Sequence, residues 1–323
     1  EGRVLSAEEF EGEHVYYHRN KNVGGSGGFT RGIIEALAED IKPTNIILMD
    51  DDVKFFPDSF RRVFAILSTI RDEYKDYFIS GAMLEINERN VQHEDVGLFS
   101  DMGQHGPIKP RYDMNIWDSV VRNEEFEINT EHSYAGWWYC CIPTTIARLD
   151  NLPLPLFVRG DDVEYSLRNH AKFITMNGIC IWHEGFGTKF SASLELYQVH
   201  RNDLILQAMN EDETSGIDII SRIKWLFWEE MYKFNYKGAD LLLDAVEDFL
   251  KGPDFIQNLN GEICMKEKKG KDNKLLPLNL EIESKINYDE LYVNKPLGRI
   301  SKIIYDYSCN GHRIPKIFCR KDI

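Results

Sequence analysis

The sequence predicts an α/β fold, because short apolar runs of strand length alternate with longer segments of helical periodicity up to about residue 202. A triplet of aspartates directly follows the first of these runs, which is where open α/β sheets place their ligand sites. Beyond residue 202 the apolar residues recur at helical spacing only. We therefore predict two domains, an α/β domain over residues 1–202 and a mainly helical domain over residues 203–323.

Each element follows from a local pattern. The runs that we expect to form strands are residues 46–49, 78–84 and 179–182, with at most one more strand around residues 13–17. The segments that we expect to form helices are residues 59–74, 163–170, 197–211, 217–234 and 239–250. Breaks are expected at Gly238 and at Gly252-Pro253. The charged stretch 266–274 has no periodicity and is predicted to be an exposed loop.

The composition excludes some classes of protein. With 323 residues, 43% of them hydrophobic, the chain can bury a full core. Its net charge of −15 argues against nucleic acid as the main partner, because phosphate backbones attract basic surfaces. The six cysteines show no CxxC pair and no metal-ligand spacing, which favours reduced thiols and a cytoplasmic location. No apolar run is long enough to span a bilayer.

The aspartate triplet Asp50, Asp51 and Asp52 is the strongest indication of a site. In extended backbone, the first and third carboxylates point to the same side. Hard oxygen ligands suit Mg²⁺ or Mn²⁺, and these ions share their coordination shell with substrate phosphates. The implied partner is a nucleotide diphosphate, although a turn built from aspartate side chains is the alternative.

A glycine-rich segment, residues 22–32, precedes the triplet and opens into a helical pattern. Glycine lets backbone N–H groups approach a ligand, and the start of the following helix favours an anion. The segment matches neither the Walker A loop nor the dinucleotide fingerprint, so a flexible loop is the alternative.

Three further motifs lie downstream. Asp161 and Asp162 stand at a predicted helix start, where Asp161 and Glu164 could form a helix cap that leaves Asp162 without a capping role. His183 ends a short apolar strand, as a metal ligand or as an ordinary hydrogen-bonded residue. The aromatic cluster 134–139 is either core or a wall on which sugar rings stack.

In this order, the glycine-rich segment, the aspartate triplet, the paired tryptophans, the aspartate pair and the Trp-His motif resemble those of an inverting GT-A glycosyltransferase of family 2. Within that family they are most similar to the galactofuranosyltransferase-like branch, which builds bacterial cell-surface polysaccharides. The resemblance runs from about residue 18 to residue 201 and implies a Rossmann-like GT-A core. It implies that Asp50, Asp52 and His183 bind the Mn²⁺ or Mg²⁺ that holds the sugar nucleotide, and that Asp162 is the catalytic base.

The same resemblance implies binding roles for other residues. Contacts to the nucleotide-sugar donor, expected to be UDP-linked, are assigned to Asn22, Gly24, Gly25, Gly27, Gly28 and Asp51. Contacts to the acceptor are assigned to Trp137, Trp138, Asp161 and Glu94, with a solvated loop carboxylate as the alternative for Glu94. The strand–helix–strand with which the family reads the nucleobase is not found, so we expect the sequence to be part of a longer chain.

The tail, residues 295–321, is basic and interleaved with aliphatic and aromatic residues. Such a segment could lie on the anionic inner face of the cell membrane, where a lipid-linked acceptor would be found. A terminal helix docked on the acidic body, or a contact to another subunit of a homo-oligomer, is slightly favoured.

The sequence thus predicts a metal-dependent transferase that moves a hexose to a cell-surface polysaccharide or a lipid-linked glycan. Galactofuranose from UDP-galactofuranose is the first choice of donor, and a rhamnosyl or other hexosyl donor is the alternative. Two other classes stay open: a glycoside hydrolase that uses Asp162 and a second carboxylate, and an inactive carbohydrate-binding module that binds through Trp137 and Trp138.

Overall fold

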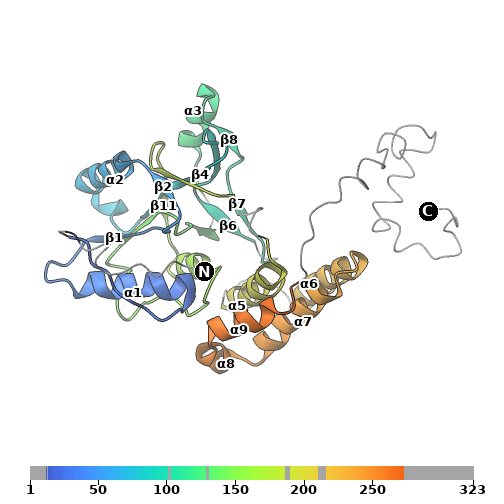
Figure 1. Cartoon of the computed structure of the whole chain (residues 1–323). Helices are drawn as coiled ribbons and strands as arrows, with labels where there is room; N and C mark the ends of the chain where they lie inside the picture. Colours follow the sequence, from blue (N-terminus) through green and yellow to red (C-terminus); the bar gives the residue numbers. More distant parts are fainter. Residues whose placement is uncertain are drawn as a thin grey trace, which may run out of the picture.

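The computed structural model describes residue 12 and residues 14–100, 103–128, 131–185, 190–209 and 216–272. These residues form a mixed α/β protein, in agreement with the predicted fold class. Figure 1 shows the sheets gathered with α1 and α2 in one part of the molecule and helices α5 to α9 beside them. Within the described residues, none of the helices combines the length and the apolar character that crossing a membrane requires.

Three sheets carry the strands. The first has the order β1 (Asn45–Leu48), β10 (Cys140–Pro143), β3 (Phe78–Ser80) and β11 (Phe173–Ile174), and only the pairing of β3 with β11 is parallel. The second has the order β2 (Lys54–Phe55), β12 (Cys180–His183), β4 (Ala82–Glu85), β5 (Val91–Glu94) and β8 (Tyr112–Asp113). The third has the order β7 (His105–Pro107), β6 (Gly97–Phe99) and β9 (Ser133–Tyr134).

The apolar run 78–84 was predicted as one strand, and this is wrong. Gly81 divides it into β3 and β4, which belong to different sheets. The Gly81 N–H donates to the carbonyl of Tyr139 at 2.9 Å. A Cβ on Gly81 would lie 2.6 Å from the Tyr139 ring, so the close approach requires glycine. The apolar pattern hides the break because both halves are buried.

Helices cover both faces of the first sheet. Helix α1 (Gly24–Ala38) and α4 (Asp161–Arg168) pack on one face, in a core that includes Ile33, Phe78 and Tyr165. Helix α2 (Pro57–Thr69) packs on the other face, where Val63 meets Ile79. In the view of Figure 1, α1 lies below β1 and α2 lies above it. Strand β10 is buried along its whole length because its alternate side chains enter the two cores.

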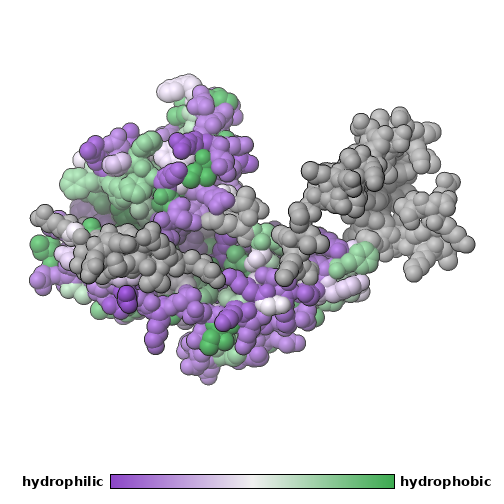
Figure 2. All heavy atoms as spheres, viewed as in Figure 1, coloured by the Kyte–Doolittle hydropathy of each residue, from purple (hydrophilic) through white to green (hydrophobic). Residues whose placement is uncertain are grey.

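The described part of the chain beyond residue 192 is mainly helical, as the periodicity of residues 197–211, 217–234 and 239–250 predicts. It consists of the π-helical segment η4 (Ser193–Val199), α5 (His200–Met209), α6 (Gly216–Tyr232), α7 (Tyr236–Leu250), α8 (Pro253–Asn258) and α9 (Gly261–Lys269). Helix α7 packs against η4, α5 and α6, and Figure 2 shows a mainly hydrophilic surface over this part. Helix α5 spans residue 202, so the domain boundary expected there stays a prediction.

Smaller elements complete the described chain. Helix α3 (Trp117–Glu125) precedes β9, and a short 3-10 helix (Asp72–Tyr74) follows α2, so the predicted helix 59–74 is two elements. The strand expected around residues 13–17 is absent from its described residues, 14–17, where only an isolated bridge joins Val15 to Gly12.

The break predicted at Gly252-Pro253 is confirmed, because α7 ends before it and α8 begins at Pro253, but one predicted break and one predicted loop differ. Gly238 does not interrupt a helix, because it lies inside α7 and its N–H donates to the capping Oδ1 of Asn235 at 3.1 Å. The stretch 266–274 is not a loop throughout, because α9 continues to Lys269. Ion pairs stabilise it: Asp244 of α7 lies 2.8 Å from the Lys268 Nζ and 2.6 Å from the Lys271 Nζ. The tail 295–321 lies outside the described residues.

Candidate metal and catalytic site

The ends of β1 and β12 bring Asp50, Asp52 and His183 together. Each of these residues offers a ligand atom, and the atoms lie within 4.8 Å of one another. The His183 Nε2 lies 3.1 Å from Asp52 Oδ1, and its Nδ1 lies 2.6 Å from the carbonyl oxygen of Glu184. Because a carbonyl can only accept, Nδ1 carries the hydrogen, so in the neutral form of the ring the lone pair is on Nε2. Histidines that bind metals are commonly oriented in this way.

The electrostatics of this group indicate a shortage of positive charge. Burial raises the pKa of Asp50 to about 6, His183 opposes the increase, and the carboxylates of Asp52, Asp162 and Asp51 add to it. A divalent cation would reverse this effect by favouring the ionised carboxylate. Asp51 is exposed and does not belong to the group that offers ligand atoms.

Asp161 and Asp162 begin α4 after a conformationally unusual loop. Phe157, Arg159 and Gly160 all have positive φ, at 72°, 66° and 82°. Side chains other than glycine rarely adopt this backbone conformation, and such strain is concentrated at functional sites. The cap of α4 is Gly160 rather than Asp161, and no side chain caps the helix, so the capping alternative for Asp161 is wrong.

Asp161 is buried and Asp162 is half-buried. Burial, followed by the charge of Asp162, raises the pKa of Asp161. Burial also raises the pKa of Asp162. The N–H of Val163, which donates to Asp162 Oδ1 at 2.8 Å, the positive charges of His105 and Arg159, and the N–H of Asp162 itself oppose this increase. Asp162 therefore has both a raised pKa and nearby cations, a combination typical of a general base.

The glycine-rich segment is helical where a loop was the alternative, because α1 begins at Gly24. Its start is fixed to the loop before α4: the N–H of Phe157 donates to Ser26 Oγ at 3.1 Å. Gly24 has φ 73°, and a Cβ there would lie 1.8 Å from the Phe157 carbonyl oxygen. A Cβ on Gly25 would lie 3.8 Å from Asp161 Oδ2, so the glycines stand beside the aspartate pair.

The other predicted donor residues lie around this helix start. Asn22 is exposed, and its Oδ1 accepts from the Gly24 N–H at 3.3 Å. Gly27 and Gly28 lie in the first turns of α1. Their contacts with a nucleotide, like those of Gly24, Gly25 and Asp51, stay predictions.

Trp137 and Trp138 are buried, with 3% and 7% of their surface exposed. Trp137 packs edge-on against Phe29 and Tyr165. The Trp138 Nε1 donates to the carbonyl of Gly81 at 2.9 Å. Their place in the two cores favours the core alternative, and a role at the acceptor site stays a prediction.

Glu94 ends β5 and is 5% exposed, so the alternative of a solvated loop carboxylate is wrong. Burial, followed by the charge of Asp162, raises the pKa of Glu94 to about 8, while a hydrogen bond with Tyr134 opposes the increase. Its Oε1 is buried and has no hydrogen-bond partner among the described residues. A buried polar atom without a partner is costly and marks a place where a ligand can bond.

Three residues near the aspartate pair were missed at the level of sequence: Arg159, His105 of β7 and Asp203 of α5. His105 and Asp203 are 98 positions apart and belong to no recognisable motif. No spacing signal could have joined them.

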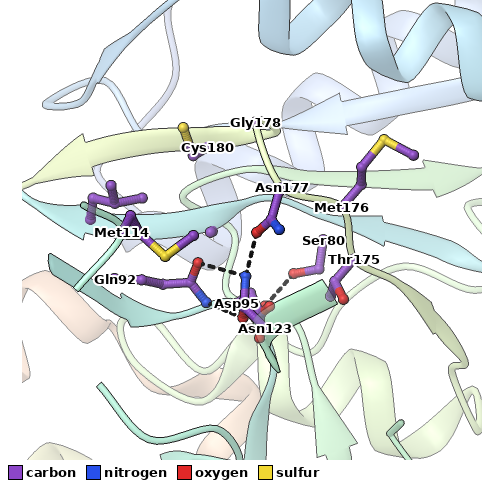
Figure 3. A pocket seen from close by; sticks show the side chains of 12 residues that line it. Ser80, Gln92, Asp95, Met114, Asn123, Thr175, Met176, Asn177, Gly178 and Cys180 are labelled. Carbon is purple, nitrogen blue, oxygen red and sulfur yellow. Dashed lines mark hydrogen bonds between the residues drawn. The ribbon is translucent and has the colours of Figure 1, made fainter. Parts of the chain in front are cut away.

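The cavity in Figure 3 is a separate feature. Its volume is about 130 Å³, and none of the predicted site residues lines it. Gln92, Asn123 and Asn177 point toward one another inside it, and their amides bond one another at 2.7 to 3.1 Å. Because these polar groups already have partners, the cavity offers less to a ligand than the carboxylate-rich site does.

Comparisons with known proteins bear on this site. No family model matches the chain. The chain is 30% identical over 260 residues to the galactofuranosyltransferase GlfT2 of Mycobacterium tuberculosis, covering 76% of this chain and 40% of the relative. It is 32% identical over 257 residues to GlfT2 of Mycolicibacterium smegmatis, covering 75% of this chain and 39% of the relative. The chain thus spans about two fifths of the length of these relatives, and it is similar to glycosyltransferases over about three quarters of its own length.

Proposed function

We propose that the chain is the catalytic part of a metal-dependent inverting glycosyltransferase with a GT-A core. The donor that we propose is UDP-galactofuranose, and the acceptor is a cell-surface or lipid-linked glycan. The observation that carries the proposal is the convergence of Asp50, Asp52 and His183 close to Asp162. The similarity to two galactofuranosyltransferases supports the same reaction and the same donor sugar.

The three converging residues fit a divalent cation. Two carboxylates supply hard oxygen ligands, and His183 supplies the Nε2 lone pair that its bond to the Glu184 carbonyl leaves available. Mg²⁺ or Mn²⁺ held by Asp50, Asp52 and His183 would neutralise the charge that develops on the leaving nucleoside diphosphate. A GT-A site of this kind binds the donor through its diphosphate.

Asp162 is the proposed base. Inversion at the anomeric carbon requires the acceptor hydroxyl to attack from the face opposite the leaving group, and to lose its proton as it does so. Asp162 would accept that proton. Burial brings its pKa closer to neutrality, where a general base is most effective, and the cations of His105 and Arg159 keep it available in the ionised form.

Glu94 is the proposed contact to the acceptor. With a pKa of about 8 it carries a proton at neutral pH, so it can donate a hydrogen bond to a sugar hydroxyl as well as accept one. Its partnerless Oε1 and its closeness to Asp162 favour this role.

The other partners follow from the same proposal. A cytoplasmic location, a peripheral contact with the membrane through residues 295–321 and a homo-oligomeric state are part of it. They are independent of the chemistry at Asp162 and can be tested separately, by fractionation, by vesicle flotation and by light scattering.

The decisive experiment measures UDP release from UDP-galactofuranose with a galactofuranose oligosaccharide as acceptor. We expect turnover with Mn²⁺ and none with excess EDTA. In Asp162→Asn, kcat should fall about 10²- to 10⁴-fold, the usual contribution of a general base. The Kd for UDP with Mn²⁺, measured by calorimetry, should stay within about two-fold, because Asp162 is not among the ligand group.

Asp118→Asn is a matched control, because Asp118 is an exposed aspartate that pairs with Arg122 on α3. It should leave kcat unchanged. Turnover that survives EDTA, or an absence of UDP binding in the presence of Mn²⁺, would overturn the proposal.

A further inference from the structure

His105 connects the aspartate pair to the helical part of the chain. It lies on β7, and its Nε2 is 2.5 Å from Oδ1 of Asp203 on α5. Its ring packs on Phe99, with centroids 5.1 Å apart, and on Tyr134, with centroids 6.1 Å apart. The position of the ring is therefore fixed both by a short polar contact and by aromatic packing.

Asp203 is itself held by basic side chains. Its carboxylate is buried, with 3% of the side chain exposed, and lies 3.7 Å from Nδ1 of His200 and 3.4 Å from Nη2 of Arg222 on α6. The same Arg222 Nη2 donates to the carbonyl of Gly103 at 2.7 Å, just before β7. A buried carboxylate surrounded in this way stays ionised: burial raises the pKa of Asp203, but the hydrogen bonds of His105 and His200 outweigh it and lower the pKa.

The charge of Asp203 determines the charge of His105. Burial by itself lowers the pKa of His105, but the hydrogen bond and charge of Asp203, followed by the charge of Asp162, raise it above its ordinary value. Arg222 acts in the opposite direction. An imidazolium is thus favoured beside the proposed base, where its positive charge lowers the pKa of Asp162.

We propose that His105 is a positioning residue for Asp162: held by Asp203, it provides a fixed positive charge that stabilises the ionised carboxylate needed to accept the proton of the acceptor hydroxyl. This inference rests on the proposed role of Asp162. The proton passes from the acceptor to Asp162, and His105 keeps its own proton throughout. Because Asp203 and Arg222 belong to α5 and α6, the helical part contributes to the charge balance of a site formed by the sheets.

The other charged groups around these residues do not replace His105. Glu94 also faces His105, and burial leaves it largely protonated at neutral pH. Asp162 is influenced by Arg159 as well, whose Nη2 lies 3.7 Å from Oε1 of Glu195. The carboxylate of Glu195 thus partly neutralises the positive charge of Arg159.

The test is the pH profile of kcat/KM. His105→Gln keeps a hydrogen-bond donor for Asp203 but removes the charge, so the pKa of Asp162 should rise and the acid limb should move up by about one pH unit. Asp203→Asn should move it in the same direction, because His105 then loses its proton more easily. His105→Lys keeps the charge and should bring the acid limb back toward that of the wild type.

Matched controls separate this effect from general destabilisation. His18→Gln replaces a histidine that pairs with Glu35 on α1, and Asp244→Asn replaces an aspartate paired with Lys268 in the helical part. Neither should shift the acid limb. If His105→Gln and Asp203→Asn fold but also leave the acid limb unmoved, the inference is wrong even though the proposed function stands.

A second measurement does not depend on turnover. In histidine-labelled protein followed by NMR, the ring of His105 should titrate above the ordinary histidine range, and Asp203→Asn should lower its pKa by about one unit or more. A wild-type protein that shows this titration but does not turn over UDP-galactofuranose would contradict the proposed function and leave the charged pair intact. A His105 that titrates in the ordinary range, in a protein that does turn over, would overturn the inference alone.

Discussion

At the scale of single residues, the site is a set of carboxylates that need a cation. Asp50 and Glu94 have pKa values raised by burial, to about 6 and about 8, and both are influenced by the charge of Asp162. Groups of like charge in a poorly hydrated site cannot all be ionised unless a positive charge compensates them. His105, Arg159 and the proposed metal would provide this compensation.

Asp52→Asn tests the ligand group. Its carboxylate lies 3.1 Å from His183 Nε2, so we expect the loss of one charged ligand to weaken Mn²⁺-dependent binding of UDP by about ten-fold or more, as measured by calorimetry. Asp58→Asn is the matched control, because it removes an exposed aspartate of α2 that pairs with Arg61 and offers no ligand atom to the group. Equal losses in the two variants would show that Asp52 acts only through the net charge of the protein.

Glu94→Gln tests the buried acid. The pKa of Glu94 is raised, so the folded protein holds this proton more tightly than the unfolded chain does. This tight proton binding therefore contributes fully to stability at pH values below 4.5, the pKa of Glu94 in the unfolded chain. The contribution is lost as the pH rises through about 8, its pKa in the folded protein. Glu94→Gln has no charge to bury, so it should be more stable than the wild type at pH 8, by about 1–3 kcal/mol, and close to it at pH 5.

Urea unfolding at the two pH values measures this difference. At the same time, the variant should raise KM for the acceptor if Glu94 contacts it. Stabilisation that is equal at pH 5 and at pH 8 would mean that the gain does not come from the charge of Glu94.

At the scale of elements, the junction of α1 with the loop before α4 is the critical contact. Gly24 packs against the Phe157 carbonyl, and Ser26 bonds the Phe157 backbone, so the glycine-rich helix start holds the loop from which Asp161 and Asp162 project. Two helices distant in sequence thus form one wall of the site. The glycine at the contact is required by geometry, whether or not it also approaches a nucleotide.

Gly24→Ala should destabilise the protein by about 1–3 kcal/mol, because the new Cβ would meet the Phe157 carbonyl and the positive φ would be strained. Gly28→Ala is its counterpart: no atom lies within 4 Å of the added Cβ, and alanine favours the helix by about 0.5–1 kcal/mol. Urea midpoints of the two variants should therefore move in opposite directions. A destabilised Gly28→Ala protein would indicate a contact at Gly28 that these packing distances do not include.

At the scale of the whole molecule, the chain carries a net charge of −15, and several of its carboxylates converge on one site. A ligand that binds only the folded state stabilises it in proportion to its affinity. Divalent cations should therefore act on the stability of the whole protein and not only on turnover.

Mn²⁺ at about one hundred times its Kd should stabilise the folded protein by about 2.7 kcal/mol, seen as a rise in Tm by calorimetry. At the same Mn²⁺ concentration, the rise in Tm should be larger at pH 8 than at pH 5. The Asp50 carboxyl, with a pKa of about 6, is mostly protonated at pH 5, so protons compete with the metal there. Asp52→Asn should show a smaller rise at pH 8. An identical rise in the variant would place the stabilising ion elsewhere on this acidic protein.

Apolar periodicity and short motifs in the sequence were sufficient to predict some features of the fold and the site, but not others. The aspartate triplet, the aspartate pair and His183 each follow or begin an element whose apolar pattern is readable, so their positions at element ends could be predicted. The division at Gly81 could not, because both halves of the run are apolar and only the Tyr139 ring determines where the chain changes sheet. Lys268, in the stretch predicted to be a loop, lies in α9 and pairs with Asp244 of another helix, a contact that no local pattern shows.

The α/β class and the helical character of the described residues beyond residue 192 could be predicted from the sequence, and its motifs indicate residue types that suit a cation and a sugar nucleotide. This was possible because periodicity and short motifs are local properties of the chain. Three features could be seen only in the folded chain: Glu94 is buried beside Asp162, both tryptophans are enclosed in cores, and His105 contacts Asp203. The reason is physical: burial and the charge of a neighbour set the protonation of each group, and both depend on residues brought together from distant parts of the chain.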